Sequence, residues 1–436
     1  MPQHLSTGSA LSAQRDFPRI TAWDSTLAWL ADPYRFIGRT CAELGADVFE
    51  ARLLLRPTLC MSGARAAEAF CDLVRVQREG AAPEPLRATL FGKGGVQGLD
   101  GLHHRQRKAF FMAVVSPERV DRLVECVRQE WEQALTGWSA RGPMPLYRAL
   151  QPVLMRAACT WAGVPLPESD VRARTRQCVA MFDSAVAGPV GHLRSRYARR
   201  QAETWLERLV EEARAGRLKL PPGGAAHAAA WHRDEVSAEP LPPRTAAVEL
   251  LNVLRPTVAV SVFITHLARA LHLHPAWKAV LADQPADSAD ALAFVQEVRR
   301  QCPFFPAVMA KVRKEFVWNG FRFPEGRRLV LDLYGTNHDP RIWTEPDAFR
   351  PERWRGLRPS RFEFIPQGGG EASTNHRCPG EDVAVQLMLL ALRMLLCRMT
   401  YDVPPQDLDL AMDRLPAVPR QGLLIHRVGL SASHSR

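Results

Sequence analysis

The residue whose setting most plainly suggests chemistry is Cys378, in the segment HRCPGE. It follows a glycine-rich stretch and precedes the apolar run VAVQLMLLALRMLLC at 383–397, which predicts a helix. A thiolate near a helix N-terminus is stabilised by unpaired backbone N–H groups and the helix dipole, and Pro379 suits a first turn because no amide proton is needed there. His376 and Arg377 add positive charge. This local chemistry fits a functional thiolate and an ordinary buried cysteine at a helix cap equally well.

Glu297 and Arg300 form a second notable pattern, because their spacing in FVQEVRRQCPFFP places both on one face of a predicted helix. Such a pair contributes only about 0.2–0.5 kcal/mol by itself. The later segment 332–354 carries prolines, aromatic residues and charges without helical or strand periodicity. That composition is typical of an ordered segment that braces the core.

Helices are the elements that must position these residues. Apolar residues recur at three- and four-residue spacing within 24–300, most clearly at 120–138 and 202–218. The stretch 245–273 is almost wholly apolar and predicts a central buried helix, in which Glu249 and Arg255 are the only charges of the first half.

Two regions depart from this helical pattern. Residues 220–243 are rich in Pro, Gly and Ala and predict a loop or mobile connection. Beyond 315, apolar and polar residues alternate around Asn319-Gly320 and Pro324-Glu325-Gly326, which predicts a hairpin followed by a further strand. The fold class expected is therefore mainly α with a small β portion.

Composition narrows the function classes. The nine cysteines are odd in number and form no C-x-x-C pair, so we expect neither disulfides nor a zinc site, and a reducing cytoplasm is the expected location. No signal-peptide pattern and no run of about 18 apolar residues occurs, so we expect a soluble protein without an integral membrane segment.

The net charge of +11 is spread along the chain, so no nucleic-acid partner is expected. We interpret the densest cluster as a solvated helix face: Arg194, Arg196, Arg199 and Arg200.

Taken in order, Glu297-x-x-Arg300, the segment PERW with Arg353, and the Cys378 loop resemble the cytochrome P450 superfamily. The resemblance implies the cytochrome P450 fold in a single domain, 1–436, with 1–20 as a flexible tail. It implies a structural lock of Glu297, Arg300 and Arg353, and Cys378 as the axial ligand of a haem b iron. A thiolate pushes electron density onto iron and favours O–O cleavage.

Two departures from the common pattern point to one branch of that superfamily. Thirteen residues separate Phe364 from Cys378, where most members have a shorter loop. Arg255-Pro256 stands where most oxygen-activating members carry an acid followed by Thr, the pair that delivers protons to dioxygen. With stretches such as LFGKGGVQGLDGLHHRQRKAFF and LYGTNHDPRIW, these features resemble the bacterial fatty-acid peroxygenases, which include alkene-forming decarboxylases. Hydrogen peroxide is then the co-substrate, and no redox partner is required.

The same resemblance implies that Arg255 binds the carboxylate of a fatty-acid substrate. An arginine on a buried helix is costly unless paired, and a carboxylate would satisfy its planar fork. Pro256 removes a backbone hydrogen bond and is expected to open the helix there. The alternative is that Arg255 pairs with Glu249 or caps a neighbouring element.

Further positions carry over from the family, each with an ordinary alternative. Four cationic or imidazole side chains match positions near the haem propionates, and each could equally be a plain surface charge: Arg78, His104, Arg107 and His376. Gln97 matches a distal position that holds Gln in typical hydroxylases and His in the best-known decarboxylase, so hydroxylation is favoured. Three phenylalanines are candidate walls of an acyl channel, or simply core residues: Phe91, Phe304 and Phe305.

These expectations combine into one favoured function, the peroxide-dependent hydroxylation of long-chain fatty acids at the alpha or beta carbon. Decarboxylation to a terminal alkene and peroxygenation of another acid are the nearest alternatives. A reductase-dependent monooxygenase is a third, and a non-catalytic haem sensor or carrier is a fourth.

Overall fold

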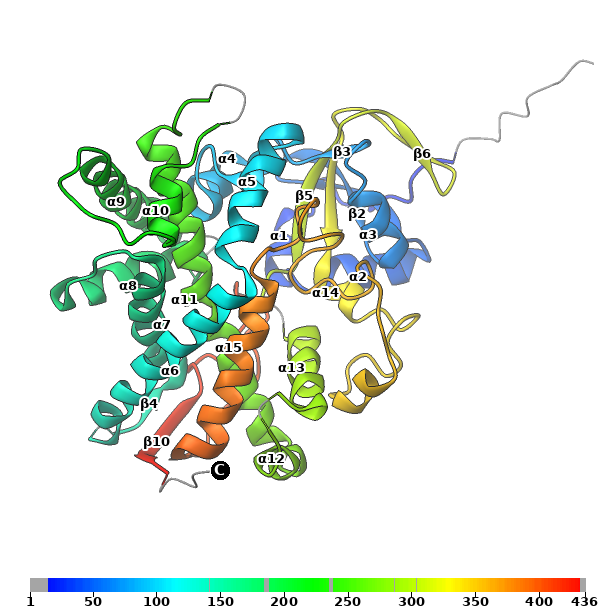
Figure 1. Cartoon of the computed structure of the whole chain (residues 1–436). Helices are drawn as coiled ribbons and strands as arrows, with labels where there is room; N and C mark the ends of the chain where they lie inside the picture. Colours follow the sequence, from blue (N-terminus) through cyan, green and yellow to red (C-terminus); the bar gives the residue numbers. More distant parts are fainter. Residues whose placement is uncertain are drawn as a thin grey trace, which may run out of the picture.

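The structure is a computed structural model that describes residues 15–140, 142–183, 188–234, 238–285, 287–302 and 304–431. Figure 1 shows the helices α6 to α11 gathered on one side and the main sheet on the other, as expected for a mainly α chain with a small β portion. The helices are α1 (Thr26–Ala31), α2 (Phe36–Leu44), α3 (Ala64–Phe70), α4 (Glu84–Leu86), α5 (Gly101–Val114), α6 (Pro117–Ser139), α7 (Leu146–Ala162), α8 (Glu168–Asp183), α9 (Gly188–Arg214), α10 (Ala225–Ala230), α11 (Pro243–Leu273), α12 (Pro275–Ala282), α13 (Ala289–Gln301), α14 (Leu333–Asn337) and α15 (Glu381–Arg393).

The predicted central helix is α11, which packs against α7, α9 and α15. It is long and apolar enough to cross a membrane, but 94% of its most apolar stretch is buried inside the molecule, as in a core helix. The expectation that Pro256 opens the helix is wrong, because α11 continues through this residue. Pro256 only deprives the carbonyl of Asn252 of an amide partner.

The strands form three sheets. The largest has the order β1-β2-β8-β5-β3, in which β2 and β8 run parallel and the other pairs run antiparallel. The bounds are β1 (Val48–Leu53), β2 (Arg56–Met61), β3 (Val76–Gln77), β4 (Met144–Pro145), β5 (Ala307–Val312), β6 (Phe316–Trp318), β7 (Phe321–Phe323), β8 (Arg328–Asp332), β9 (Met399–Asp402) and β10 (Leu424–Leu430). The predicted hairpin and following strand are confirmed as β6, β7 and β8.

Three expectations need correction. The segment 220–243 contains the helix α10, four of whose five alanines are buried and which packs against α11. Of the expected tail, residues 1–14 lie outside the described residues, whereas Arg15 and Ile20 donate backbone hydrogen bonds to Gly320 and Glu50. Arg199 is not on a solvated face: it is 2% exposed and bonds to backbone carbonyls of residues 89–91 and to Glu203.

Candidate active site

One cavity brings most of the predicted site residues together. Its volume is about 270 Å³, and it lies between α11, α5, the loop before α15 and the segment after α13. Cys378 is the one cysteine among its described lining residues, and Arg255 and Pro256 line it as well. The other predicted residues in its wall are Phe91, Gln97, His104, Phe304, Phe305 and His376.

The loop that carries Cys378 is held by its own backbone. The amide of Cys378 donates to the carbonyl of Gln367 at 3.0 Å. Gly368 adopts a φ of 99°, a conformation that other residues rarely adopt. Burial raises the pKa of the Cys378 thiol, while the Gly380 amide, the Lys108 ammonium and the Gln367 side chain lower it. The thiolate form thus depends on positive charge, such as a metal ion would bring.

Arg255 is buried without a matching anion. Within the described part of the chain, no ion pair includes it, its Nε has no hydrogen-bond partner, and its Nη2 reaches only Asn252 Oδ1, at 3.5 Å. Burial, with a smaller contribution from Arg199, lowers the pKa of Arg255 to about 9, so its guanidinium remains charged at neutral pH. The alternative pairing with Glu249 is not formed. Arg255 therefore places a guanidinium with unpaired hydrogen-bond donors in the wall of the cavity.

Glu249 is engaged elsewhere, in a buried polar chain. Its Oε1 accepts from Arg107 Nη1 at 2.6 Å, and its Oε2 accepts from Asn252 Nδ2 at 3.1 Å. Burial raises the pKa of the Glu249 carboxyl, and the Arg107 ion pair opposes that rise. Arg107, expected beside the haem, is absent from the cavity wall, because this carboxylate already satisfies it.

This chain also sets the orientation of two amides. An ionised carboxylate only accepts hydrogen bonds, so Asn252 must turn its Nδ2 toward Glu249, which leaves Oδ1 facing Arg255. The same Nδ2 donates to Gln97 Oε1 at 3.3 Å. Because its Oε1 accepts from Asn252, Gln97 carries its Nε2 donor on the other side of the amide, and the residue lines the cavity. Sequence reasoning missed Asn252, although its position three residues before Arg255 on the same helix face was a usable signal.

A group of buried nitrogen donors lies on another side of Cys378. The rings of His104 and His376 lie 4.0 Å apart, and Lys108 lines the cavity one turn after His104. Burial lowers the pKa of His104 to about 4, of His376 to about 3 and of Lys108 to about 8. Among the described residues, the nearest acceptor to His376 Nε2 that forms an ion pair with it is Asp100 Oδ1 at 3.6 Å, just beyond hydrogen-bond distance. Lys108 was missed from the sequence, although its spacing from His104 pointed to it.

Arg78 lies beside this group rather than in the cavity wall. Its Nη1 donates to the carbonyl of Met309, and its guanidinium lies over Phe70 at 4.6 Å from the ring centroid. Arg78 and His376 both line a smaller pocket that adjoins the cavity. A cofactor with an apolar plane, a soft-metal centre and anionic edge groups would match this arrangement of Cys378, apolar walls and buried nitrogen donors, of which Lys108 also donates to the carbonyl of Arg377.

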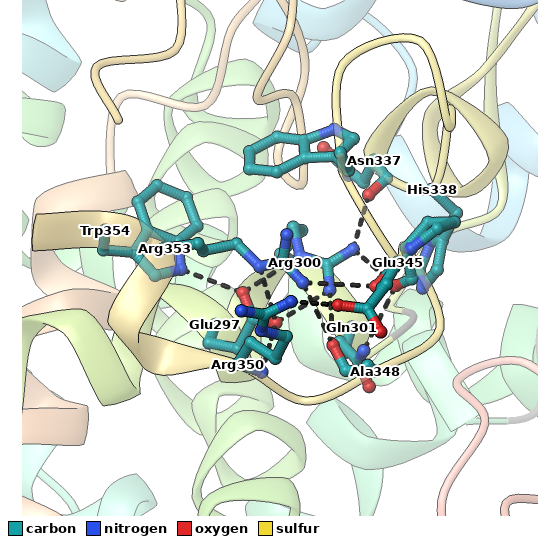
Figure 2. A network of polar contacts seen from close by, with 12 residues as sticks. Glu297, Arg300, Gln301, Asn337, His338, Glu345, Ala348, Arg350, Arg353 and Trp354 are labelled. Atoms are coloured by element: carbon teal, nitrogen blue, oxygen red, sulfur yellow. Dashed lines mark hydrogen bonds and ion pairs between the residues drawn. The ribbon is translucent and has the colours of Figure 1, made fainter. Parts of the chain in front are cut away.

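The residues of the expected structural lock contact one another away from the cavity (Figure 2). Arg300 donates to both oxygens of Glu297, at 2.8 and 3.0 Å, and Arg353 Nε donates to Glu297 Oε1 at 3.2 Å. The Trp354 indole N–H and the Arg350 backbone amide also donate to the Glu297 carboxylate, at 2.9 Å each. This network ties α13 to the segment that leads to the cysteine loop.

Comparisons with known proteins agree with this geometry. The cytochrome P450 family model matches residues 291–427. Tabersonine 6,7-epoxidase isoform 1 from Catharanthus roseus is 33% identical over 126 residues, which cover 27% of this chain and 24% of that protein. Cytochrome P450 71D18 from Mentha gracilis is 32% identical over 130 residues, 28% of this chain and 25% of its own length. The matching segment thus spans about a quarter of the length of these curated relatives.

Solved structures match over almost the whole chain. Cytochrome P450SP alpha in complex with (R)-ibuprophen is 50% identical, with a TM-score of 0.91 over 93% of this chain and 99% of its own. Cytochrome P450EX alpha with myristic acid is 40% identical, with a TM-score of 0.92 over 96% of this chain and 100% of its own. Ligand-free cytochrome P450 OleT is 32% identical, with a TM-score of 0.91 over 96% of this chain and 100% of its own. The chain therefore belongs to the cytochrome P450 superfamily, in the branch of these three proteins, and its haem is ligated by a cysteine, for which Cys378 is the residue in the cavity.

Proposed function

We propose that the protein hydroxylates long-chain fatty acids with hydrogen peroxide, at the carbon alpha or beta to the carboxylate. One observation carries this proposal: the unpaired guanidinium of Arg255 lines the same cavity as Cys378. A fatty acid supplies both the carboxylate that Arg255 lacks and an apolar chain for the phenylalanine walls. That cytochrome P450EX alpha was solved with myristic acid supports this substrate class.

Each residue then has a defined part. Arg255 binds the carboxylate, which fixes the distance between the head of the substrate and the carbons near it. Gln97 presents its amide N–H group to the peroxide side, and Asn252 holds that orientation. Phe91, Phe304 and Phe305 exclude water from the acyl chain. The bound carboxylate is the acid–base group that assists peroxide cleavage, because no acidic residue lines the cavity among those described.

The bound haem supplies the redox chemistry that transfers one oxygen atom from peroxide to a C–H bond, leaving water as the second product. His104, Lys108, His376 and Arg78 would hold its propionates. Peroxide brings both oxidising equivalents, so the reaction needs no reductase. A cytoplasmic location belongs to the same proposal and is supported by nine cysteines that are all free.

The test is product identification from haem-loaded protein given myristic acid and hydrogen peroxide without any reductase. We expect 2- or 3-hydroxymyristic acid by mass analysis. A terminal alkene one carbon shorter would instead identify a decarboxylase. Absence of oxidised products while the haem absorbance persists would refute peroxygenation. Activity that requires NAD(P)H and a reductase would identify a monooxygenase, and ligand binding without a product under any oxidant would identify a sensor.

A further inference from the structure

Five large apolar side chains gather on the surface where α1 meets the β1–β2 turn. This Leu54–Leu55 patch consists of Trp23, Leu27, Leu30, Leu54 and Leu55, which are 74%, 82%, 49%, 41% and 64% exposed. Hydrogen bonds join its two segments, because the amide of Leu54 donates to Thr26 Oγ1 at 2.6 Å and that of Leu55 to Asp24 Oδ2 at 2.9 Å. These hydrogen bonds hold residues 24–26 against the tip of the β1–β2 hairpin, so the exposed side chains come from two segments that lie side by side.

The backbone of the turn is unfavourable for the residues that form it. Leu53 pairs with Arg56, which leaves Leu54 and Leu55 as a two-residue hairpin loop with φ values of 51° and 60°. Left-handed conformations of this kind favour Asn and Gly, and bulky residues rarely adopt them. Neither leucine is buried, so internal packing does not explain their presence.

The same chain builds an equivalent turn with favoured residues. In the β6–β7 hairpin, Trp318 pairs with Phe321, and the loop is Asn319-Gly320 with φ values of 50° and 79°. Leucines at the tip of β1–β2 are thus a departure from what folding alone favours. Strain combined with exposure points to a function outside the fold.

Two arginines, Arg52 and Arg56, flank the turn. The guanidinium of Arg52 lies 5.4 Å from the ring centroid of Trp23, and neither Arg52 nor exposed Arg56 takes part in an ion pair within the described ranges. Asp24, the acid at the tip, accepts backbone amides from Thr26 and Leu55. Tryptophan and leucine flanked by arginine are the chemistry of an anionic membrane interface.

We propose that the Leu54–Leu55 patch docks the protein on an anionic phospholipid surface. Leu54, Leu55, Trp23 and Leu27 would enter the headgroup region, and Arg52 and Arg56 would meet lipid phosphates. A protein partner fits less well, because a stable interface needs about 20–30 residues a side and the patch offers only five apolar ones. This contact is peripheral and uses no membrane-spanning helix.

The decisive variant, L54N/L55G, replaces the two leucines of the turn by Asn-Gly, the pair of residues that such a turn prefers. The test measures co-sedimentation of the full haem-loaded chain with vesicles of phosphatidylglycerol and phosphatidylcholine, and with phosphatidylcholine alone. We expect wild type to prefer the anionic vesicles, and the variant to bind them about tenfold more weakly. Its melting temperature should equal or exceed that of wild type, because the strain is relieved. The loss of binding is then not a loss of folding.

Leu292→Gln is the matched control, since it removes a leucine that is 41% exposed on α13, outside the patch. It should bind vesicles as wild type does. Three results would overturn the proposal: wild type that ignores anionic vesicles, an L54N/L55G variant that binds as wild type does, or a wild-type oligomer that this variant converts to monomer in light scattering, which would identify a protein interface. None involves substrate or peroxide, so the outcome is independent of the proposed catalytic function.

Discussion

Arg300 and Arg255 are both buried arginines on core helices, and they differ in how completely their donors are matched. Arg300 bonds to both oxygens of Glu297 and to the carbonyls of Asn337 and Pro346, at 2.8–3.0 Å. Among the residues that the structure describes, Arg255 has one long contact, to Asn252, and an Nε without a partner. Burial of the charge costs free energy in both cases, but only the contacts of Arg300 offset this cost within the fold. For Arg255 the cost is offset when an anion binds.

This difference separates residues that hold the fold from residues that bind a ligand. Around Arg300, every oxygen of Glu297 is saturated, and the network fixes the segment before the cysteine loop. On the helix that carries Arg255, the carboxylate of Glu249 is already paired with Arg107. Within the described ranges, Arg255 thus has no counter-ion in the fold.

The largest expected effect is on stability, from Glu297→Ala. Removing one partner of a buried ion pair costs about 3–5 kcal/mol, because it leaves Arg300 and Arg353 without their anion. Denaturant unfolding followed by haem absorbance measures it. The control is Glu125→Ala, which breaks an exposed pair with Arg128 and should cost less than about 1 kcal/mol. Equal losses in the two variants would contradict the structural role of the network.

Arg255→Ala should affect binding instead of stability. A charge-assisted contact to the substrate carboxylate is worth about 1.5–3 kcal/mol, so myristic acid should bind roughly 10- to 150-fold more weakly. Stability should stay the same or rise, because an unpaired buried cation is removed. Spectroscopic titration of the haem and denaturant unfolding separate the two effects. Unchanged affinity would remove Arg255 from substrate binding.

A smaller effect is expected from Asn252→Ala, which releases Gln97. Loss of a neutral hydrogen bond costs about 0.5–1.5 kcal/mol, and we expect it in the peroxide-driven rate. Affinity for the fatty acid should be unchanged or slightly tighter, since the contact from Arg255 to Asn252 is long at 3.5 Å. Rates and fatty-acid affinities measured side by side test this split. Equal losses in both would mean that Asn252 acts through Arg255.

Sequence reasoning found the residues whose roles depend on local spacing or on family motifs. Cys378, Arg255 and Gln97 all line one cavity, and the Glu297 pair was visible from helical periodicity. It failed where partners come from distant segments. Arg199 looked exposed because its helix is charged, yet beside Glu203 on the same helix it bonds to backbone carbonyls about 110 positions away.

Arg107 illustrates the same limit. Its pairing with Glu249 joins two helices 142 positions apart, and no periodicity within either helix reveals it. Lys108 and Asn252 were recoverable in part, because each lies one helical turn from a residue already identified. The physical distinction that the sequence lacked was which buried charges the fold would neutralise by itself.

The smallest effect is the pH dependence of carboxylate binding. Burial lowers the pKa of Arg255 to about 9, and a bound carboxylate raises it again, so binding takes up a proton as pH rises past this value. Affinity for myristic acid should be flat near neutrality, about twofold weaker at pH 9, and should fall further above it. The sign follows because the charged guanidinium, present below this pKa, is the binding form. Arg255→Ala should abolish this dependence, and a variant that retained it would assign the titration to another group.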